Sequence, residues 1–285
     1  MLSEVKCNLC KSKDSKPIVT LNKFKMPLCV VKCRRCGLMY QNPQLDFENM
    51  KSFYSQDYYT GEGDVSYTTD FNKYKAVSIE RLRIIEKMRS PGKLLDIGCH
   101  SGIFLEAAKE RGWDSWGIDV SPFIVEKAKQ RGLNVTLGEL QDIKFESLSF
   151  DVVTMYEVIE HLFSPLETLQ EIHRILKGNG LLIVQTANMD SLRVKIIEPK
   201  NFYFLPVHVY YFTRKTIVKM LQKAGFKIII IFQGSEFDMS TELKLFKDEV
   251  PVWKLFLRKL FNNVSLMGYA LNSSMVVYAA KCEKL

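Results

Sequence analysis

A short stretch near the middle of the chain concentrates side chains that bind protons or metal ions. Glu157, Glu160 and His161 fall within five positions, in the sequence MYEVIEHL that begins at Met155. If this stretch forms a helical turn, Glu157 faces the same side as Glu160 and His161, because residues three and four positions apart are neighbours on a helix. Carboxylates and imidazoles bind divalent metals and also transfer protons. The stretch therefore predicts a site for acid–base or metal-assisted chemistry.

Four cysteines near the start of the chain have the spacing of zinc ligands. Two Cys-x-x-Cys pairs can bring four thiolates to one tetrahedral Zn²⁺, and four protein ligands leave no open position for catalysis. We therefore predict a small zinc ribbon in which the metal is structural. The ligands are Cys7, Cys10, Cys33 and Cys36. The three other cysteines, Cys29, Cys99 and Cys282, are interpreted as small apolar residues.

The net charge of +8 is concentrated in the ribbon segment. Residues 1–36 carry nine Lys and Arg residues against two acidic ones, Glu4 and Asp14, so this segment holds +7 of the total. A basic segment can bind an anionic partner such as RNA, but it can equally be an ordinary solvated surface. The charge therefore permits nucleic-acid binding without indicating it.

The composition indicates a globular protein. Hydrophobic residues make up 47% of the 285 residues, enough to bury a core. The longest aliphatic run, 228–232, is too short to cross a bilayer, and no signal peptide is visible. Seven cysteines, four of them spaced as metal ligands, favour a reducing compartment. We expect a cytoplasmic protein.

From residue 93 onwards, short apolar strands alternate with amphipathic helices. This pattern predicts an α/β fold with a doubly wound, mostly parallel, seven-stranded sheet. No helix separates the last two strands clearly, so we expect an antiparallel final pair. The predicted strands are 93–98, 115–119, 133–138, 150–156, 181–187, 226–232 and 274–282. The predicted helices are 71–88, 103–112, 122–132, 166–180 and 213–225, the last capped by Thr213.

The chain is predicted to have three parts. Residues 1–40 form the zinc ribbon, 41–90 a polar, tyrosine-rich linker with N-terminal capping helices, and 91–285 the α/β domain. The linker is expected to hold a short helix over 46–54. The basic amphipathic stretch 250–261 is interpreted as a helix that packs on the core, with a membrane-surface or partner-binding helix as the alternatives.

The turn after the first predicted strand of the sheet reads LLDIGCHSG. Ligands of such sheets bind beyond the carboxyl ends of the strands. A dinucleotide fingerprint, G-x-G-x-x-G, is not met, because His100 and Ile103 stand where its second and third glycines belong. A nicotinamide-dependent oxidoreductase is therefore not predicted.

The same turn resembles motif I of class I S-adenosylmethionine-dependent methyltransferases, Asp-x-Gly-x-Gly-x-Gly, with His100 replacing the middle glycine. The resemblance continues through GIDVSP, GELQD, SFDVVTMYEVIEHL and HVYYFTRKTIVKMLQKAGF to about Gly225, and includes the ribbon of one subfamily, the type 23-like methyltransferases. It implies S-adenosylmethionine as cofactor, with an acidic residue on the ribose. The implied contacts are Asp96, Gly98, Cys99, Gly102, Asp119, Val120, Glu139, Leu140 and Tyr156. His100 tolerates positive φ better than most residues, so the loop is expected to keep its path.

Three interpretations of the acidic and histidine residues stay open. Glu157, Glu160, His161 and His208 resemble the metal site of small-RNA 2′-O-methyltransferases, and Glu-x-x-Glu-His also resembles metal-assisted ubiquinone-pathway O-methyltransferases. A bound Mg²⁺ or Mn²⁺ would lower the pKa of the acceptor hydroxyl. The catalytic candidates are Glu157, His161 and His208, and in the second interpretation His161 or His208 is a metal-free base. In the third, Glu157 caps the next helix and His161 pairs with Glu160.

The acceptor is predicted from the same resemblance. The subfamily is associated with sugar and polysaccharide modification, so we expect a small-molecule or carbohydrate-like acceptor. The aromatic segment 202–212 is interpreted as a lid over this acceptor, with a hydrophobic cap as the alternative. RNA is a second possible acceptor, because some ribosomal-RNA methyltransferases also carry a zinc ribbon. An inactive adaptor is a third reading, based on His100.

Overall fold

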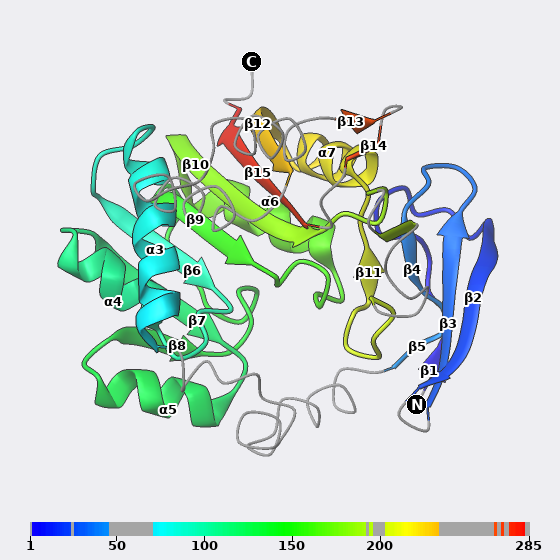
Figure 1. The fold of residues 1–285 in the computed structure, drawn as a ribbon, viewed down its shortest axis with the longest axis horizontal. Coiled ribbons are helices and arrows are strands. Elements are labelled where there is room, and N and C mark those ends of the chain that lie inside the picture. The colour runs from blue at the N-terminus through cyan, green and yellow to red at the C-terminus, as the bar shows by residue number, and fades with distance from the viewer. Residues whose placement is uncertain are drawn as a thin grey trace, which may run out of the picture.

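Seven strands form one sheet in the computed structural model, which describes residues 2–23, 26–45, 71–191, 194–195, 203–233, 265–266, 269–270 and 274–282 (Figure 1). The strands are β6 Lys93–Ile97, β7 Asp114–Asp119, β8 Asn134–Leu137, β9 Phe150–Tyr156, β10 Leu176–Ala187, β12 Phe226–Gln233 and β15 Ser274–Lys281. Their order is β12-β15-β10-β9-β6-β7-β8. The strands from β10 to β8 are parallel, and β15 is antiparallel to both β10 and β12. The predicted sheet and its antiparallel final pair are confirmed.

Helices cover both faces of this sheet. They are α3 Phe71–Glu86, α4 Ile103–Glu110, α5 Pro122–Gln130, α6 Pro165–Ile175 and α7 Arg214–Lys223. Successive side chains of a strand point to opposite faces. Leu94 of β6 accordingly packs in one core cluster with Leu82 of α3, whereas Leu95 packs in the other with Leu169 of α6. The sheet is therefore doubly wound.

The helix predicted over 166–180 is shorter than expected. It ends at Ile175, and the next residues already belong to β10. The carbonyl groups at the end of α6 accept N–H groups of the preceding loop, at Leu148 and Ser149. Two glycines, which are poor helix formers, follow within five residues. The prediction that a glycine closes this helix was therefore wrong.

The cap predicted for α7 is confirmed. The Thr213 hydroxyl oxygen accepts the N–H of Thr216 at 3.2 Å, and the Thr216 hydroxyl oxygen accepts the N–H of Thr213 at 2.9 Å. This reciprocal pair is a capping box, which satisfies two N–H groups at the start of the helix. The capping box fixes the point at which the aromatic segment turns into α7.

The N-terminal residues form a small sheet beside the large one (Figure 1). It contains β2 Ser15–Lys23, β3 Met26–Cys33 and β4 Met39–Gln41, joined by β11 Tyr210–Tyr211 in the order β11-β4-β3-β2. A separate pair is formed by β1 Leu2–Ser3 and β5 Gln44–Leu45. Leu38 and Tyr40 are fully buried and belong to the same hydrophobic cluster as Leu95. The ribbon and the α/β domain therefore share a core.

The aromatic segment is buried, so it is not a lid. The exposed fraction is 7% for Phe204 and at most 3% for Tyr210, Tyr211 and Phe212. Tyr210 and Tyr211 pair with Tyr40 and Met39 of the ribbon as strand β11. These side chains fill the space between the ribbon and the large sheet, as the hydrophobic-cap alternative predicted.

Several predictions fall outside the described residues. They are the short helix over 46–54, the rest of the linker up to residue 70, the amphipathic stretch 250–261 and Phe202. A further strand pair, β13 Ser265–Leu266 with β14 Tyr269–Ala270, lies apart from both sheets. Over the ranges that the structure describes, the helices are too short or too polar to cross a membrane.

Candidate functional site

The turn after β6 follows the tight path expected for a ligand-binding loop. Gly98 and Gly102 have positive φ angles of 69° and 77°, and His100 lies between them at 49°. Histidine enters this left-handed region more readily than most residues with a Cβ. His100 thus adopts the positive φ on which the expectation for this loop rests.

Close packing also requires the two glycines. A Cβ at Gly98 would lie 2.5 Å from Val158 Cγ2, and a Cβ at Gly102 would lie 2.3 Å from Leu133 Cδ1. Both distances are far below van der Waals contact. The loop therefore packs at Gly98 against the turn that follows β9, which carries the acidic and histidine residues, and at Gly102 against Leu133 before β8.

Asp119, predicted to bind ribose, holds this loop from the end of β7. It is buried, and its two carboxylate oxygens accept the backbone N–H groups of His100 and Ser121, each at 2.9 Å. Burial raises the pKa of Asp119, although the backbone hydrogen bonds act in the opposite direction. Each carboxylate oxygen can accept more than one hydrogen bond. Asp119 can thus hold the loop and a ligand hydroxyl at once.

Asp96 lies beneath the loop and is nearly inaccessible to solvent. Its Oδ1 accepts a hydrogen bond from the Thr154 hydroxyl at 2.6 Å. Burial raises the pKa of Asp96 to about 7, while the Thr154 hydrogen bond and the charge of Arg81 oppose this rise. Near neutral pH this carboxyl group is therefore present in both its protonated and its ionised form.

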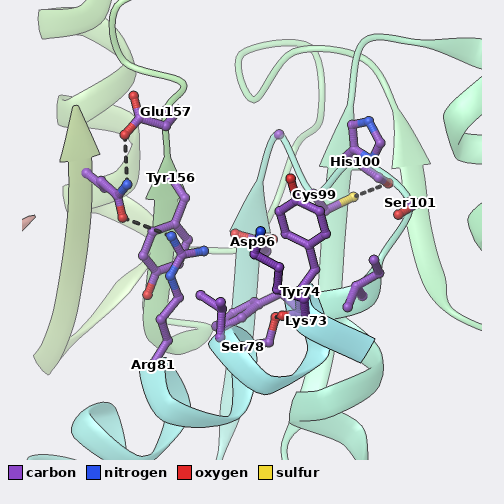
Figure 2. Close-up of a pocket in the computed structure, with 15 residues that line it drawn as sticks. Lys73, Tyr74, Ser78, Arg81, Asp96, Cys99, His100, Ser101, Tyr156 and Glu157 are labelled. Carbon is purple, nitrogen blue, oxygen red and sulfur yellow. Dashed lines mark hydrogen bonds between the residues drawn. The ribbon is translucent and has the colours of Figure 1, made fainter. Parts of the chain in front are cut away.

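A cleft of about 290 Å³ opens beside the loop (Figure 2). Ordinary small-molecule sites measure roughly 300–1,000 Å³, so the cleft is close to the size of a ligand site. Four predicted cofactor contacts line it: Asp96, Gly98, Cys99 and Tyr156. The five others are not among its described lining residues: Gly102, Asp119, Val120, Glu139 and Leu140. Of these, Leu140 is only 2% exposed and packs in the core.

One wall of the cleft comes from α3, which sequence reasoning did not assign to the site. Tyr74, Ser78 and Arg81 lie on one face of this helix and line the cleft. The Arg81 guanidinium carbon is 3.7 Å from the centre of the Tyr156 ring, and Nη2 donates to Gln185 Oε1 at 2.9 Å (Figure 2). No local sequence pattern marks Arg81, because its partners Tyr156 and Gln185 are distant in the chain.

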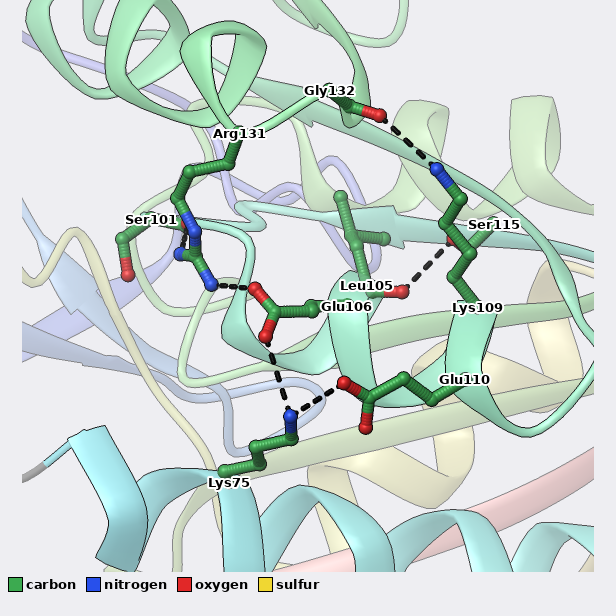
Figure 3. A network of polar contacts seen from close by, with 9 residues as sticks. All are labelled: Lys75, Ser101, Leu105, Glu106, Lys109, Glu110, Ser115, Arg131 and Gly132. Carbon is green, nitrogen blue, oxygen red and sulfur yellow. Dashed lines mark hydrogen bonds and ion pairs between the residues drawn. The ribbon is translucent and has the colours of Figure 1, made fainter.

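Charged side chains hold α3 against α4 and the loop (Figure 3). Lys75 Nζ lies 3.3 Å from a Glu106 carboxylate oxygen and 2.6 Å from one of Glu110. Arg131, at the end of α5, forms an ion pair with Glu106 and donates to the Ser101 carbonyl at 2.7 Å. Partly exposed ion pairs contribute at most about 1 kcal/mol each. Their effect here is to fix the position of the cleft wall.

The stretch that contains Glu157 is not a helical turn. Glu157 has a positive φ of 55°, and a hydrogen bond from the His161 N–H to the Val158 carbonyl closes a tight turn after it. The Glu157 carboxylate accepts a hydrogen bond from Gln185 Nε2 at 2.7 Å and faces the cleft. The alternative that Glu157 caps the next helix is wrong, since Ser164 is the N-cap of α6.

Three of the four predicted acid–histidine residues meet. The ligand atoms of Glu160, His161 and His208 all lie within 4.8 Å of one another, and Glu157 is not part of this group. The two imidazole rings are perpendicular, with centres 4.8 Å apart. We call these three residues the acid–histidine cluster. The β9 turn and the segment after β10 bring them together.

Hydrogen bonds orient every member of the cluster. Nδ1 of His161 is 2.9 Å from the Val207 carbonyl oxygen, and Nδ1 of His208 is 3.0 Å from that of Tyr203. A carbonyl only accepts, so both Nδ1 atoms carry the hydrogen and each neutral ring has its lone pair on Nε2. The Thr186 hydroxyl donates to Glu160 Oε2 at 3.0 Å. Metal-binding imidazoles are commonly oriented in this way.

Burial controls the charges in the cluster. It lowers the pKa of His161 to about 3, with a further contribution from His208. It also raises the pKa of Glu160 well above its usual range, and the negative charge of Glu157 adds to this. At neutral pH His161 is therefore uncharged, as a metal ligand must be. A cation in the cluster would favour the ionised form of Glu160.

The four predicted zinc ligands also meet. Their sulfur atoms lie within 4.8 Å of one another, with 3.4 Å between Cys7 and Cys36 and 3.5 Å between Cys10 and Cys33. Tetrahedral zinc with Zn–S bonds of about 2.3 Å needs sulfur atoms about 3.8 Å apart. A hydrogen bond from the Cys7 thiol lowers the pKa of Cys36 to about 5. The four residues fit a structural zinc ion.

Comparison with known proteins shows the family to which this chain belongs. A family model described as a methyltransferase domain matches residues 71–230. The ubiquinone biosynthesis O-methyltransferase of Saccharophagus degradans is 32% identical over 170 residues. That match covers 57% of this chain and 64% of the relative. The chain thus matches less than two thirds of the length of that relative.

Solved structures share the fold. A S-adenosylmethionine-dependent methyltransferase from Archaeoglobus fulgidus is 22% identical, with a TM-score of 0.53, over 83% of this chain and all of the other. The plantazolicin methyltransferase BpumL, solved in complex with S-adenosylhomocysteine, is 15% identical, with a TM-score of 0.53, over 83% of this chain and 98% of the other. At these identities the similarity concerns the fold.

We expect the purified chain to contain one zinc ion, and Cys33→Ser to lose both the zinc and the folded ribbon. A segment this small depends on its metal, because the binding free energy of the ion is part of the folding free energy. Elemental analysis gives the stoichiometry, and circular dichroism follows unfolding. Cys29→Ser, which removes a cysteine outside the cluster, is the control. Well under one zinc per chain, or a Cys33→Ser variant that folds normally, would contradict the assignment.

Proposed function

The chain belongs to the class I S-adenosylmethionine-dependent methyltransferases, and from this premise we propose that it methylates a hydroxyl oxygen of a small molecule. One observation carries the proposal: the cleft beside the β6 loop reaches Glu157, which directly precedes the tight turn that carries Glu160 of the acid–histidine cluster. A binding cleft and groups that manage an acceptor proton are therefore adjacent. S-adenosylmethionine supplies an electrophilic methyl group, and the chain must align the acceptor with it.

The residues of the cleft fit this cofactor. Asp96 and the backbone of the loop at Gly98 and Cys99 form one wall, and Arg81 lies opposite them on α3. We propose that Arg81 holds the carboxylate end of the cofactor, since guanidinium groups match carboxylates in geometry and charge. We propose that Asp119 accepts from the ribose hydroxyls while it holds the loop. Glu139 is proposed to border the adenine, whereas Leu140 packs in the core.

The acid–histidine cluster is proposed to bind Mg²⁺ or Mn²⁺. A divalent ion held there would lower the pKa of an acceptor hydroxyl. The observation that favours a metal is geometric: both imidazoles hold Nδ1 against a backbone carbonyl, and ligand atoms of His161, His208 and Glu160 lie within 4.8 Å of one another. A neutral ring that donates through Nδ1 presents the lone pair of Nε2, which is the form in which imidazole binds a metal. Glu160 supplies a carboxylate, and His208 a second imidazole.

The proposed acceptor class follows from the relative named as an O-methyltransferase of ubiquinone biosynthesis. A carbohydrate hydroxyl belongs to the same chemical class and remains part of the proposal.

RNA has less support, because Lys11 and Arg34 of the basic ribbon form ion pairs with Glu167 and Asp14. An inactive adaptor has less support too, since the loop keeps its path at His100. A cytoplasmic location remains the proposal drawn from the cysteine content.

Asp119→Ala should weaken S-adenosylmethionine binding by about 1.5–3 kcal/mol, because hydrogen bonds to the loop and the ribose are lost. His100→Gly should bind equally well or better, since glycine adopts a φ of 49° without a steric penalty. Titration calorimetry measures both variants. A large loss of affinity in His100→Gly would mean that the imidazole itself contacts the cofactor.

Cofactor binding should release protons at pH 6 and hardly any at pH 9. The pKa of about 7 keeps Asp96 mostly protonated at pH 6, and a positively charged ligand favours its ionised form. The release can reach about 0.9 proton at pH 6. Calorimetry in buffers with different ionisation enthalpies measures it, and Asp96→Asn is the control. An equal release by Asp96→Asn would contradict the role of this carboxyl group.

Mild chelation should abolish methyl transfer while the ribbon zinc stays bound, and added Mg²⁺ or Mn²⁺ should restore it. Transfer of labelled methyl groups from S-adenosylmethionine to a panel of phenolic and sugar hydroxyl compounds provides the assay. His208→Ala should lose turnover yet bind the cofactor normally. Full activity in metal-stripped buffer with intact zinc would contradict the metal and leave the histidines as metal-free bases.

A further inference from the structure

The ribbon reaches the acid–histidine cluster through the last residue of β4. Gln41 is 3% exposed, and its backbone N–H donates to the Val209 carbonyl at 2.9 Å. Its side-chain Nε2 lies 3.0 Å from the carbonyl oxygen of Leu205, 2.9 Å from that of Pro206 and 2.7 Å from that of His208. One side chain of the ribbon therefore contacts the backbone of the segment that carries His208.

The chemistry of this contact fixes the orientation of the amide. Three carbonyl oxygens, which only accept hydrogen bonds, surround one terminal atom of Gln41. That atom must be the nitrogen, whose two N–H groups are shared among the three oxygens. Loss of the donor would leave buried carbonyl groups without these bonds, which costs more than the bonds themselves contribute.

The segment bound by Gln41 is a tight turn. The His208 N–H donates to the Leu205 carbonyl at 3.0 Å, and Pro206 occupies the second position, where its fixed φ suits a turn. Gln41 binds three of the four carbonyl groups of this turn. The fourth, that of Val207, accepts the hydrogen bond from His161 Nδ1. The turn thus lies between the ribbon and the acid–histidine cluster.

The base of the contact is the part of the ribbon that carries the four clustered cysteines. Gln41 pairs with Val30 of β3, and β3 ends at the zinc ligand Cys33. The next residue, Asn42, donates its N–H to the Cys29 carbonyl at 2.9 Å. Gln41 is therefore held by a strand that ends at one of the four proposed zinc ligands.

We propose that Gln41 is a positioning residue, which sets the place of His208 relative to Glu160 and His161. The zinc ribbon would then be a structural part of the site and not only an attached module. This inference rests on the proposed function for its effect on turnover. Its structural half, the ordering of the turn by Gln41, stands on the hydrogen bonds alone.

The ribbon has a second contact with the α/β domain, which supplies a matched control. On α6, Glu167 accepts hydrogen bonds from Asn8 at 2.7 Å and Lys11 at 2.6 Å. Neither partner belongs to the turn at 205–208 or to the acid–histidine cluster. Glu167→Ala therefore weakens the attachment of the ribbon without removing any bond to the turn.

The experiment compares Gln41→Met, which keeps the size of the side chain but donates no hydrogen bond, with Glu167→Ala and the unaltered chain. Amide hydrogen exchange should become about tenfold faster over residues 203–212 in Gln41→Met and stay unchanged in Glu167→Ala. The kcat should fall by about tenfold or more in Gln41→Met, with affinity for S-adenosylmethionine within about twofold of the original. Elemental analysis should give the same zinc content in all three proteins.

Unchanged exchange over 203–212 in Gln41→Met would overturn the inference, and so would equal loosening in Glu167→Ala. Zinc removal from the unaltered chain gives a second measurement that needs no variant. It should also accelerate exchange over 203–212, and retained protection there would count against the inference. Absence of methyl transfer by the unaltered chain would contradict the proposed function, while the exchange data would still decide whether Gln41 orders the turn.

Discussion

The carbonyl oxygen of Glu160 accepts two backbone N–H groups, from Val209 at 2.8 Å and from Tyr210 at 3.0 Å. The Val209 carbonyl in turn accepts the N–H of Gln41. These contacts join the turn after β9, the segment before α7 and the edge of the ribbon, which are far apart in the sequence. The cluster of Glu160, His161 and His208 depends on them, because they fix the backbone on either side of it.

The site departs from ordinary backbone and charge preferences at several points. His100 and Glu157 have positive φ angles, which cost of order 1–3 kcal/mol each for residues with a side chain. Asp96, Asp119 and Glu160 are buried carboxyl groups with raised pKa values. The surrounding sheet, with a core cluster on each face, stabilises these features. Such concentrations of strain and perturbed acidity are typical of functional sites.

Local patterns made much of the fold and site predictable. The cysteine spacing predicted that four sulfur atoms come together at one site. The alternation of apolar strands with helices predicted the sheet. Glu160, His161 and His208 could be grouped because neighbouring parallel strands end at one edge. Glu157 lies beside this group and interacts with Glu160, but a tight turn at 158–161 replaces the expected helical turn and keeps it out of the cluster.

Other residues could not be found from local patterns. Arg81 donates a hydrogen bond to Gln185, which is 104 positions away in the sequence. Gln41 donates to carbonyl groups of residues that are 164 to 167 positions away. The aromatic residues 210–212 suggested a lid, but strand pairing with the ribbon buries them. Such contacts depend on the assembled fold.

The central claim, that the cleft between α3 and the β6 loop binds the methyl donor, is tested most directly by a crystal structure with S-adenosylhomocysteine. The account predicts electron density for this molecule in the cleft, against Asp96, Arg81 and Tyr156; density at another place in the protein would contradict it.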